Sequence, residues 1–211
     1  MRNFTIHTRM IGAIAVVIFL LALLGATGTW GLKRVEAIGS QFVDHTHADT
    51  VTLAELRSAV GNVRRFEKDM LINYDSAEQQ ASYRPQWDKA VEQTRASASK
   101  LVASGRPEQV AIAEKIDTLL TGYVTNAAPV LKQIAAGGFN DAPVANKALG
   151  AAKDHVRGVE QQIAALGTLL DKDASTAEAA RHAVLNQSYL AFAGALLLAV
   201  VLVVPLTLAN L

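Results

Sequence analysis

The stretch MIGAIAVVIFLLALLGATGTWGL, residues 10–32, contains no Asp, Glu, Lys, Arg or His. A second stretch, AVLNQSYLAFAGALLLAVVLVVPLTLANL, covers residues 183–211 and is equally free of charge. A helix needs about 20 apolar residues to cross a bilayer, where it must satisfy all of its own backbone hydrogen bonds. Trp30 and Tyr189 stand at the two ends that face the intervening segment, where amphipathic rings favour the headgroup layer. Two transmembrane helices are therefore predicted, at residues 10–32 and 183–211.

The composition of the 211 residues excludes several classes of protein. Lys and Arg number 20 against 19 Asp and Glu, and the resulting net charge of +1 argues against a nucleic-acid-binding protein. Cys is absent, which rules out a disulfide scaffold, thiol catalysis and a Cys-type zinc site. The chain also lacks a G-x-S-x-G elbow, an H-E-x-x-H motif, a phosphate-binding Walker loop and a Gly-rich dinucleotide turn. We expect no enzyme activity and no cofactor.

The charges of the short N-terminal tail predict the orientation. Residues 1–9 contain Arg2 and Arg9 and no acidic residue, so this tail is expected in the cytoplasm of a bacterium. Residues 33–182 are then expected in the periplasm, and they carry all 19 acidic residues. The alternative is a cleaved signal peptide with residues 26–28 as the cleavage site. The uncharged run is longer than the usual hydrophobic region of about 7–15 residues, which favours the transmembrane interpretation.

Residues 33–182 are rich in Ala, Glu, Gln, Lys, Arg and Leu and lack the alternating pattern of strands, so an all-α segment is predicted. Ser76 and Gln79 have the spacing of a capping box. Gly105 is suited to the end of a helix and Pro107 to the first turn of the next one, and Asp141 fits an N-cap. These breaks predict four helices, at about 33–74, 77–104, 107–136 and 142–182. Apolar residues recur at steps of three and four in the first and last helices: Leu32, Val35, Phe42, Leu53, Leu56, Val60 and Val63, then Val156, Val159, Ile163, Leu166 and Leu170. That pattern favours an antiparallel four-helix bundle.

The layout of a short basic tail, a span, a helical bundle and a second span resembles the sensor half of a bacterial methyl-accepting chemotaxis receptor. The segment VRRFEKDML, residues 63–71, is similar to the first-helix segment of that family. The resemblance implies a homodimer, an amino acid or organic acid as ligand, and signalling by a small displacement of the last helix. Receptors of this family continue into a HAMP linker, methylation helices and a kinase-coupling tip. The cytoplasmic kinase and adaptor would be reached only through such a continuation after Leu211.

Cations on the first helix are the strongest candidates for a ligand site. At about 100° per residue, Arg57, Arg64 and Lys68 lie within about 40° of one another, and Arg65 lies near the same arc. Cations at the edge of an apolar face favour carboxylate binding, because guanidinium groups bind carboxylates bidentately. The alternative is a solvated face whose cations pair with acids one turn away. Glu67 fits neither interpretation well, because its angular position points into the apolar side.

Neighbouring helices are expected to supply further ligand contacts near the same end of the bundle. Tyr123 and Asn126 could donate hydrogen bonds to a bound acid, and His155 could add a charge or a donor. Each of the three is equally consistent with ordinary packing or surface exposure.

Two other groups of residues are assigned structural roles. Tyr83 and Trp87 are four residues apart, which favours core packing over a stacking platform. His45, His47 and Asp49 do not share one face of a helix, so a polar layer is favoured over a metal site.

The sequence thus predicts a receptor sensor module whose periplasmic bundle binds a small carboxylate, with a di- or tricarboxylate best suited to several cations. The alternatives are the sensor half of a histidine kinase, and a bundle that binds a periplasmic partner protein through an exposed apolar patch.

Overall fold

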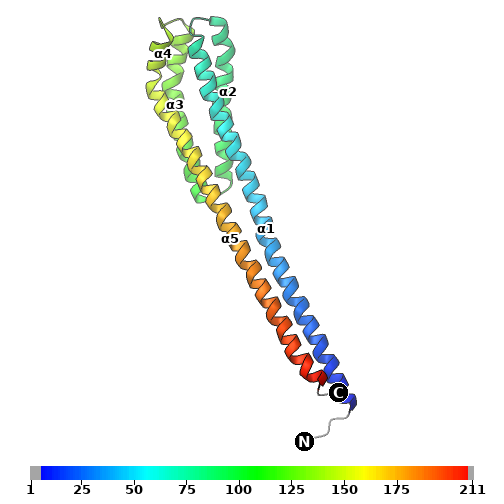
Figure 1. The fold of residues 1–211 in the computed structure, drawn as a ribbon. Coiled ribbons are helices and arrows are strands. Elements are labelled where there is room, and N and C mark those ends of the chain that lie inside the picture. The colour runs from blue at the N-terminus through cyan, green and yellow to red at the C-terminus, as the bar shows by residue number, and fades with distance from the viewer. Residues whose placement is uncertain (1–5, 209–211) are drawn as a thin grey trace. The chain divides into compact units, whose positions relative to one another are not determined.

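The computed structural model describes the backbone of residues 6–208, and their side chains except at positions 6–9, 13, 38, 40–46 and 206–208. These residues form helices and turns, with no strand among them. The helices are α1 (Ile6–Ile72), α2 (Ala77–Ala103), α3 (Pro107–Ala135), α4 (Ala142–Ala148) and α5 (Gly150–Leu208) (Figure 1). The all-α fold predicted from the sequence is therefore confirmed.

The chain divides into two compact units. The first, which we call the bundle unit, comprises His45–Asp173, and the second, the terminal unit, comprises Met1–Asp44 and Ala174–Leu211. The bundle unit contains the C-terminal part of α1, all of α2, α3 and α4, and the N-terminal part of α5. The terminal unit contains both uncharged stretches.

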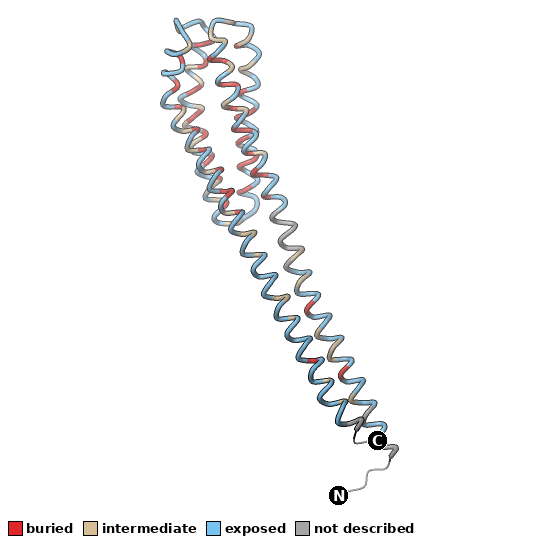
Figure 2. Tube along the Cα trace, in the orientation of Figure 1, coloured by how far each residue is buried: buried red, intermediate tan, exposed pale blue. Residues whose placement is uncertain are grey.

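The bundle unit is held together by apolar stripes on four helices that run alternately up and down (Figure 1). Figure 2 shows the buried residues of this unit on the sides of the helices that face one another. Nine predicted core residues of α1 and α5 are buried: Leu53, Leu56, Val60, Val63, Val156, Val159, Ile163, Leu166 and Leu170. Trp87, Ile116, Leu120 and Leu131 complete the core from α2 and α3. Removal of these side chains from water is the main force that assembles the bundle.

The predicted helix ends in the bundle unit are confirmed by their capping geometry. The Ser76 side chain accepts a hydrogen bond of 3.3 Å from the backbone N–H of Gln79 at the start of α2. Asp141 does the same for Val144, at 2.7 Å, at the start of α4. Between α2 and α3, Gly105 has φ +69°, a backbone conformation that favours glycine because it has no Cβ. Short turns therefore connect the antiparallel helices, with side-chain caps at the starts of α2 and α4.

One predicted helix is divided in the structure. The sequence predicted a single helix over 142–182, but α4 ends at Ala148 and α5 begins at Gly150. Leu149, between them, has φ −79° and ψ 4° and is fully buried. Glycine at 150 weakens helical continuation, and burial of Leu149 offsets the lost helix geometry. The apolar periodicity gave no sign of this break because it continues through Leu149.

The terminal unit contains both segments that are long and apolar enough to cross a membrane. One is Met10–Ala37 in α1, and the other lies within Gly150–Pro205 of α5, where the uncharged run begins at residue 183. Gly31 and Ser188 pack closely, since a Cβ on Gly31 would lie 2.9 Å from Ser188 Oγ. Leu32, which belongs to both the uncharged stretch and the apolar repeat of the first helix, has a side chain that is 69% exposed. Two helices, α1 and α5, form the described part of this unit, so they leave more of their side chains exposed than the helices of the bundle unit do.

Replacement of Ile116 by Ala tests the bundle core. Ile116 is fully buried, so we expect the free energy of unfolding to fall by about 2–5 kcal/mol. Ile72→Ala is the matched control, because Ile72 is 64% exposed and should change stability by no more than about 0.5 kcal/mol. Urea unfolding of the full chain in mild detergent, followed by Trp87 fluorescence in a Trp30→Phe background, measures both. Equal losses in the two variants would contradict the assigned core.

Candidate functional site

A buried carboxylate, that of Glu67 on α1, lies at the centre of a hydrogen-bonded chain that joins three helices. Glu67 is 2% exposed, and its Oε1 accepts a hydrogen bond of 2.8 Å from Arg64 Nη1. Its Oε2 accepts one of 2.8 Å from the hydroxyl of Tyr123 on α3. The Tyr123 oxygen in turn accepts a hydrogen bond of 2.9 Å from the indole N–H of Trp87 on α2. Because a buried carboxylate must be paired and hydrogen-bonded, this chain fixes α1, α2 and α3 relative to one another.

Burial keeps the Tyr123 phenol neutral. Its removal from water is the largest cause that raises the pKa of Tyr123 far above its usual range, and the negative charge of Glu67 raises it further. A neutral phenol can donate its proton to Glu67, as the geometry requires. Tyr123, predicted as a ligand contact, thus has its hydroxyl committed to Glu67.

Arg64 also reaches across to α5. Its Nε lies 3.7 Å from Oε1 of Glu160, whose side chain is 49% exposed. The Arg64 side chain itself is 31% exposed, so one side of the guanidinium remains open to solvent while the other holds the buried Glu67. Arg64 therefore connects the core of the bundle to the surface formed by α1 and α5.

Lys153 on α5 lies close enough to Arg64 and Glu67 for their charges to affect its pKa. Burial is the largest cause that lowers the pKa of Lys153, and the positive charges of Arg64, Arg157 and Lys68 lower it further, against the charge of Glu67. Its ammonium group contacts the side-chain oxygen of Asn146 and lies 3.4 Å from the Asn146 carbonyl oxygen. We define Arg64, Lys68, Lys153 and Arg157 as the cation cluster of the α1–α5 face. Sequence reasoning missed Lys153, although its position beside the apolar stripe of α5 was a usable signal.

The other predicted cations have different surroundings. Arg65 is 65% exposed, lies 3.7 Å from Asp69 one turn away and stacks on the ring of Phe66 at 4.8 Å. Arg57 is exposed, and its guanidinium lies against Gly167, where a Cβ would be 2.9 Å from Nη2. Of the four cations predicted on α1, Arg64 and Lys68 are the two whose charges act on Lys153, and the ligand role of all four stays a prediction.

Asn126 and His155 pack at Gly122 on α3. The amide nitrogen of Asn126 donates a hydrogen bond of 2.7 Å to the Gly122 carbonyl oxygen one turn earlier in the same helix. The ring of His155 occupies the space beside Gly122, where a Cβ would lie 2.7 Å from two ring atoms. Both side chains thus make local packing contacts, and their predicted ligand roles stay predictions.

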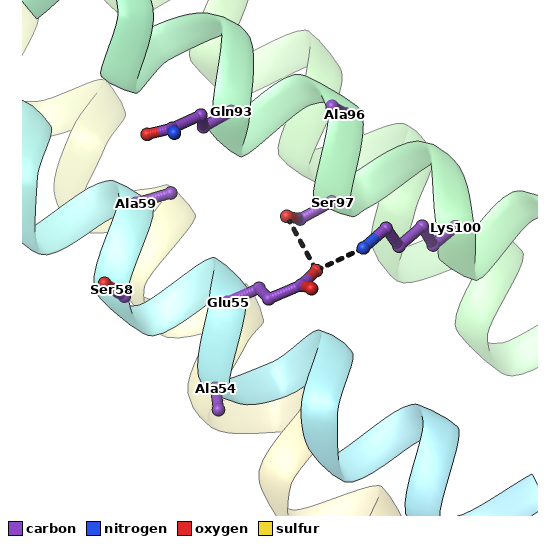
Figure 3. Close-up of a pocket in the computed structure, with 8 residues that line it drawn as sticks. All are labelled: Ala54, Glu55, Ser58, Ala59, Gln93, Ala96, Ser97 and Lys100. Carbon is purple, nitrogen blue, oxygen red and sulfur yellow. Dashed lines mark hydrogen bonds and ion pairs between the residues drawn. The ribbon is translucent and has the colours of Figure 1, made fainter.

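A shallow groove of about 520 Å³ lies between α1 and α2 (Figure 3). Small residues line much of it, and the acid of Glu55 on α1 faces Lys100 and Ser97 on α2. Lys100 Nζ lies 2.6 Å from Glu55 Oε2, and the Ser97 hydroxyl donates to the same oxygen at 3.3 Å. The hydrogen bond from Lys100 lowers the pKa of Glu55. Because these groups satisfy one another, the groove presents no free charge to a ligand.

The predicted polar layer consists of His45, His47 and Asp49 at the start of the bundle unit, and the structure describes only part of it. The side chain of His45 lies outside the described residues, and that of His47 is exposed. Asp49 is 7% exposed and forms an ion pair with Arg106 from the turn between α2 and α3. Among the residues that the structure describes, no group of three or more His, Cys, Asp or Glu is placed to hold a metal ion.

The raised pKa of Tyr123 predicts a specific loss of stability at alkaline pH. In the unfolded chain the phenol ionises at about pH 10, whereas in the folded bundle it stays protonated at higher pH. As the pH rises through 10 the unfolded state therefore binds fewer protons than the folded state, and stability falls by about 1.4 kcal/mol from pH 8 to 11. Urea unfolding at pH 8 and 11 should show this loss in the natural chain but not in Tyr123→Phe. The same alkaline loss in both proteins would contradict the assignment.

Comparison with known proteins identifies the family. A family model described as a four helix bundle sensory module for signal transduction matches residues 3–184. No curated protein and no solved structure matched the chain. The matched region includes the whole bundle unit, with Glu67, Tyr123 and the cation cluster. The chain therefore belongs to the family of four-helix-bundle sensory modules of methyl-accepting chemotaxis proteins.

Proposed function

We propose that this chain is the sensor module of a transmembrane chemotaxis receptor and binds a small organic acid on the α1–α5 face of its bundle. The observation that carries the proposal is the cation cluster, in which two cations of α1 and one of α5 lie close enough to Lys153 for their charges to affect its pKa. Burial and the positive charges of Arg64, Arg157 and Lys68 lower the pKa of Lys153, against the charge of Glu67. A bound carboxylate would favour the charged form of this lysine.

Acidic groups near the cluster define what kind of ligand it would accept. Glu67 is committed to Arg64 and Tyr123, and Asp154 pairs with Arg157 at 3.2 Å. Lys68, and Lys153 beside the neutral Asn146, therefore remain the best-placed donors for an added acid, with the solvent-facing part of Arg64, which also lies 3.7 Å from Glu160, as a third. Three donors on two helices suit a di- or tricarboxylate, or the carboxylate of an amino acid, better than a neutral molecule.

The proposed signal is a change in the preferred arrangement of α1 and α5. A ligand held by Lys68 of α1 and Lys153 of α5 stabilises whichever arrangement places both ammonium groups around it. A differential affinity equivalent to about 1–3 kcal/mol is typical of such coupling. In this proposal the bundle lies in the periplasm, the chain forms a homodimer, and α5 carries the signal across the inner membrane.

Binding measurements on charge variants test the proposed site. We expect calorimetric titration of the full chain in nanodiscs with amino acids and with mono-, di- and tricarboxylates to reveal one saturable ligand class. Lys68→Gln and Lys153→Gln should each weaken its binding about 10–100-fold, because each removes a charge-assisted contact worth about 1.5–3 kcal/mol. Arg64 is left in place, because its substitution would also leave the buried Glu67 without a cation.

Arg57→Gln and Arg65→Gln serve as matched controls for these variants. Both remove a cation from α1 outside the cluster, so the affinity should stay within about twofold of the natural value. If the folded chain bound no acid of the panel, the carboxylate proposal would be wrong and a periplasmic partner protein would be the next ligand to test.

Thiol labelling tests the proposed topology. The natural chain contains no Cys, so a single substitution gives an unambiguous label site. In intact bacterial cells, Ser82→Cys should react with a membrane-impermeant maleimide, because Ser82 is exposed on α2 of the bundle unit. Thr5→Cys should react only after the inner membrane is permeabilised. The opposite labelling pattern would reverse the proposed orientation, and cleavage after residues 26–28 would remove residue 5 altogether.

A further inference from the structure

Arg106, in the turn between α2 and α3, contacts carboxylates of two other helices. Its Nη1 donates a hydrogen bond of 3.2 Å to Asp173 on α5, and its Nη2 forms a close ion pair with Asp49 on α1. The guanidinium thus bridges the first and last helices of the bundle unit from a position on neither of them. It is 37% exposed, Asp173 is 43% exposed, and the Asp49 side chain is 10% exposed.

The turn that carries Arg106 is itself fixed. Gly105 takes a positive φ, and the backbone N–H of Arg106 lies 3.4 Å from the Ser104 hydroxyl oxygen. That oxygen is 2.7 Å from Oε1 of Gln109, a residue that is 1% exposed. These contacts fix the backbone position of Arg106, from which its side chain makes both ion pairs.

Burial makes the Asp49 contact the stronger constraint of the two. A carboxylate taken out of water needs a cation or several donors, and removal of its partner is costly. Asp173 is half-exposed, and its contact is the more easily broken, since water replaces a lost partner. The arrangement therefore holds α1 firmly to the turn and holds α5 by a releasable contact.

We propose that Arg106 is a clamp that fixes the axial position of α5 relative to α1 in the bundle unit, and that release of Asp173 permits α5 to move. This inference rests on the proposed function, because it assigns a regulatory part to the helix that would transmit the signal. Both helices continue beyond Asp49 and Asp173 toward the uncharged stretches of the chain. The clamp therefore acts on the segment of the bundle nearest in sequence to those stretches.

The geometry sets how small a movement would open the clamp. The two terminal nitrogens of a guanidinium lie in one rigid plane, so two carboxylates on different helices are held at a fixed mutual offset. Helix shifts in signalling proteins are about 1–2 Å. A shift of that size along the axis of α5 would stretch the 3.2 Å contact with Asp173 beyond ordinary hydrogen-bond distance while the contact with Asp49 persists.

Distance measurements between spin labels test the clamp. Val51→Cys on α1 and Gln161→Cys on α5 introduce one exposed label site on each helix of the otherwise Cys-free chain. The sites are staggered along the bundle, so their separation responds to axial movement of α5. In the full chain in nanodiscs, we expect one narrow distance distribution. Arg106→Gln and Asp173→Asn should shift its mean by about 1–2 Å or add a second population.

Arg95→Gln is the matched control. Arg95 also joins two helices by an ion pair, since its Nε lies 3.1 Å from Asp117 on α3, but it touches neither clamped helix through that contact. Its loss should leave the α1–α5 distance unchanged. Far-ultraviolet circular dichroism and Trp87 fluorescence confirm that each variant is folded. Should Arg106→Gln fail to fold, Asp173→Asn decides, because it leaves Arg106 paired with the buried Asp49.

An unchanged distance in the folded Asp173→Asn and Arg106→Gln variants would overturn the clamp, as would an equal shift in Arg95→Gln. This measurement uses no ligand, so it separates the two proposals. A distance shift in a chain that binds no carboxylate would support the clamp and refute the proposed ligand, whereas carboxylate binding without the shift would refute the clamp alone.

Discussion

The need to satisfy one buried carboxylate organises much of the bundle unit. Glu67 lies in an apolar interior and accepts hydrogen bonds from Arg64 and Tyr123, and the Tyr123 oxygen accepts one from Trp87. An unpaired charge there would be costly, so the helices must keep the relative positions that bring these donors together. Apolar packing alone tolerates small slips between helices, whereas directional hydrogen bonds do not. This chain of contacts also occupies one side of Arg64 and leaves the other side facing α5.

Two separate ion-pair systems then connect α1 with α5. Toward one end of the bundle Arg64 lies between Glu67 and Glu160, and toward the other Arg106 lies between Asp49 and Asp173. In both systems the acid on α1 is buried and the acid on α5 is about half-exposed. The contacts to α5 are therefore the weaker ones in each case, as the proposed movement of α5 requires. That asymmetry agrees with a role for α5 in transmission.

Periodicity and capping residues predicted most of the fold, because both act locally. The roles of Ser76 and Asp141 follow from their own backbone neighbours, and the apolar stripe of α5 follows from spacing. The break at Leu149 and the grouping of cations depend on tertiary contacts that one helix does not reveal. Arg65 and Arg64 are adjacent in sequence, yet one pairs on its own helix while the other reaches α5. The angular position of Glu67 pointed into the apolar side, where the structure buries it, but its partner Tyr123 comes from another helix and was not predictable from spacing.

The surroundings of Lys153 also change its chemical reactivity. A lowered pKa means that its amine is neutral more often than that of an ordinary lysine at the same pH. Only the neutral amine has a free electron pair, so Lys153 should be acylated by activated esters or condense with aldehydes under milder conditions. Partial burial leaves part of this side chain accessible to small reagents. Burial first, and the nearby positive charges after it, therefore set this lysine apart from the other lysines for reagents that need the neutral amine.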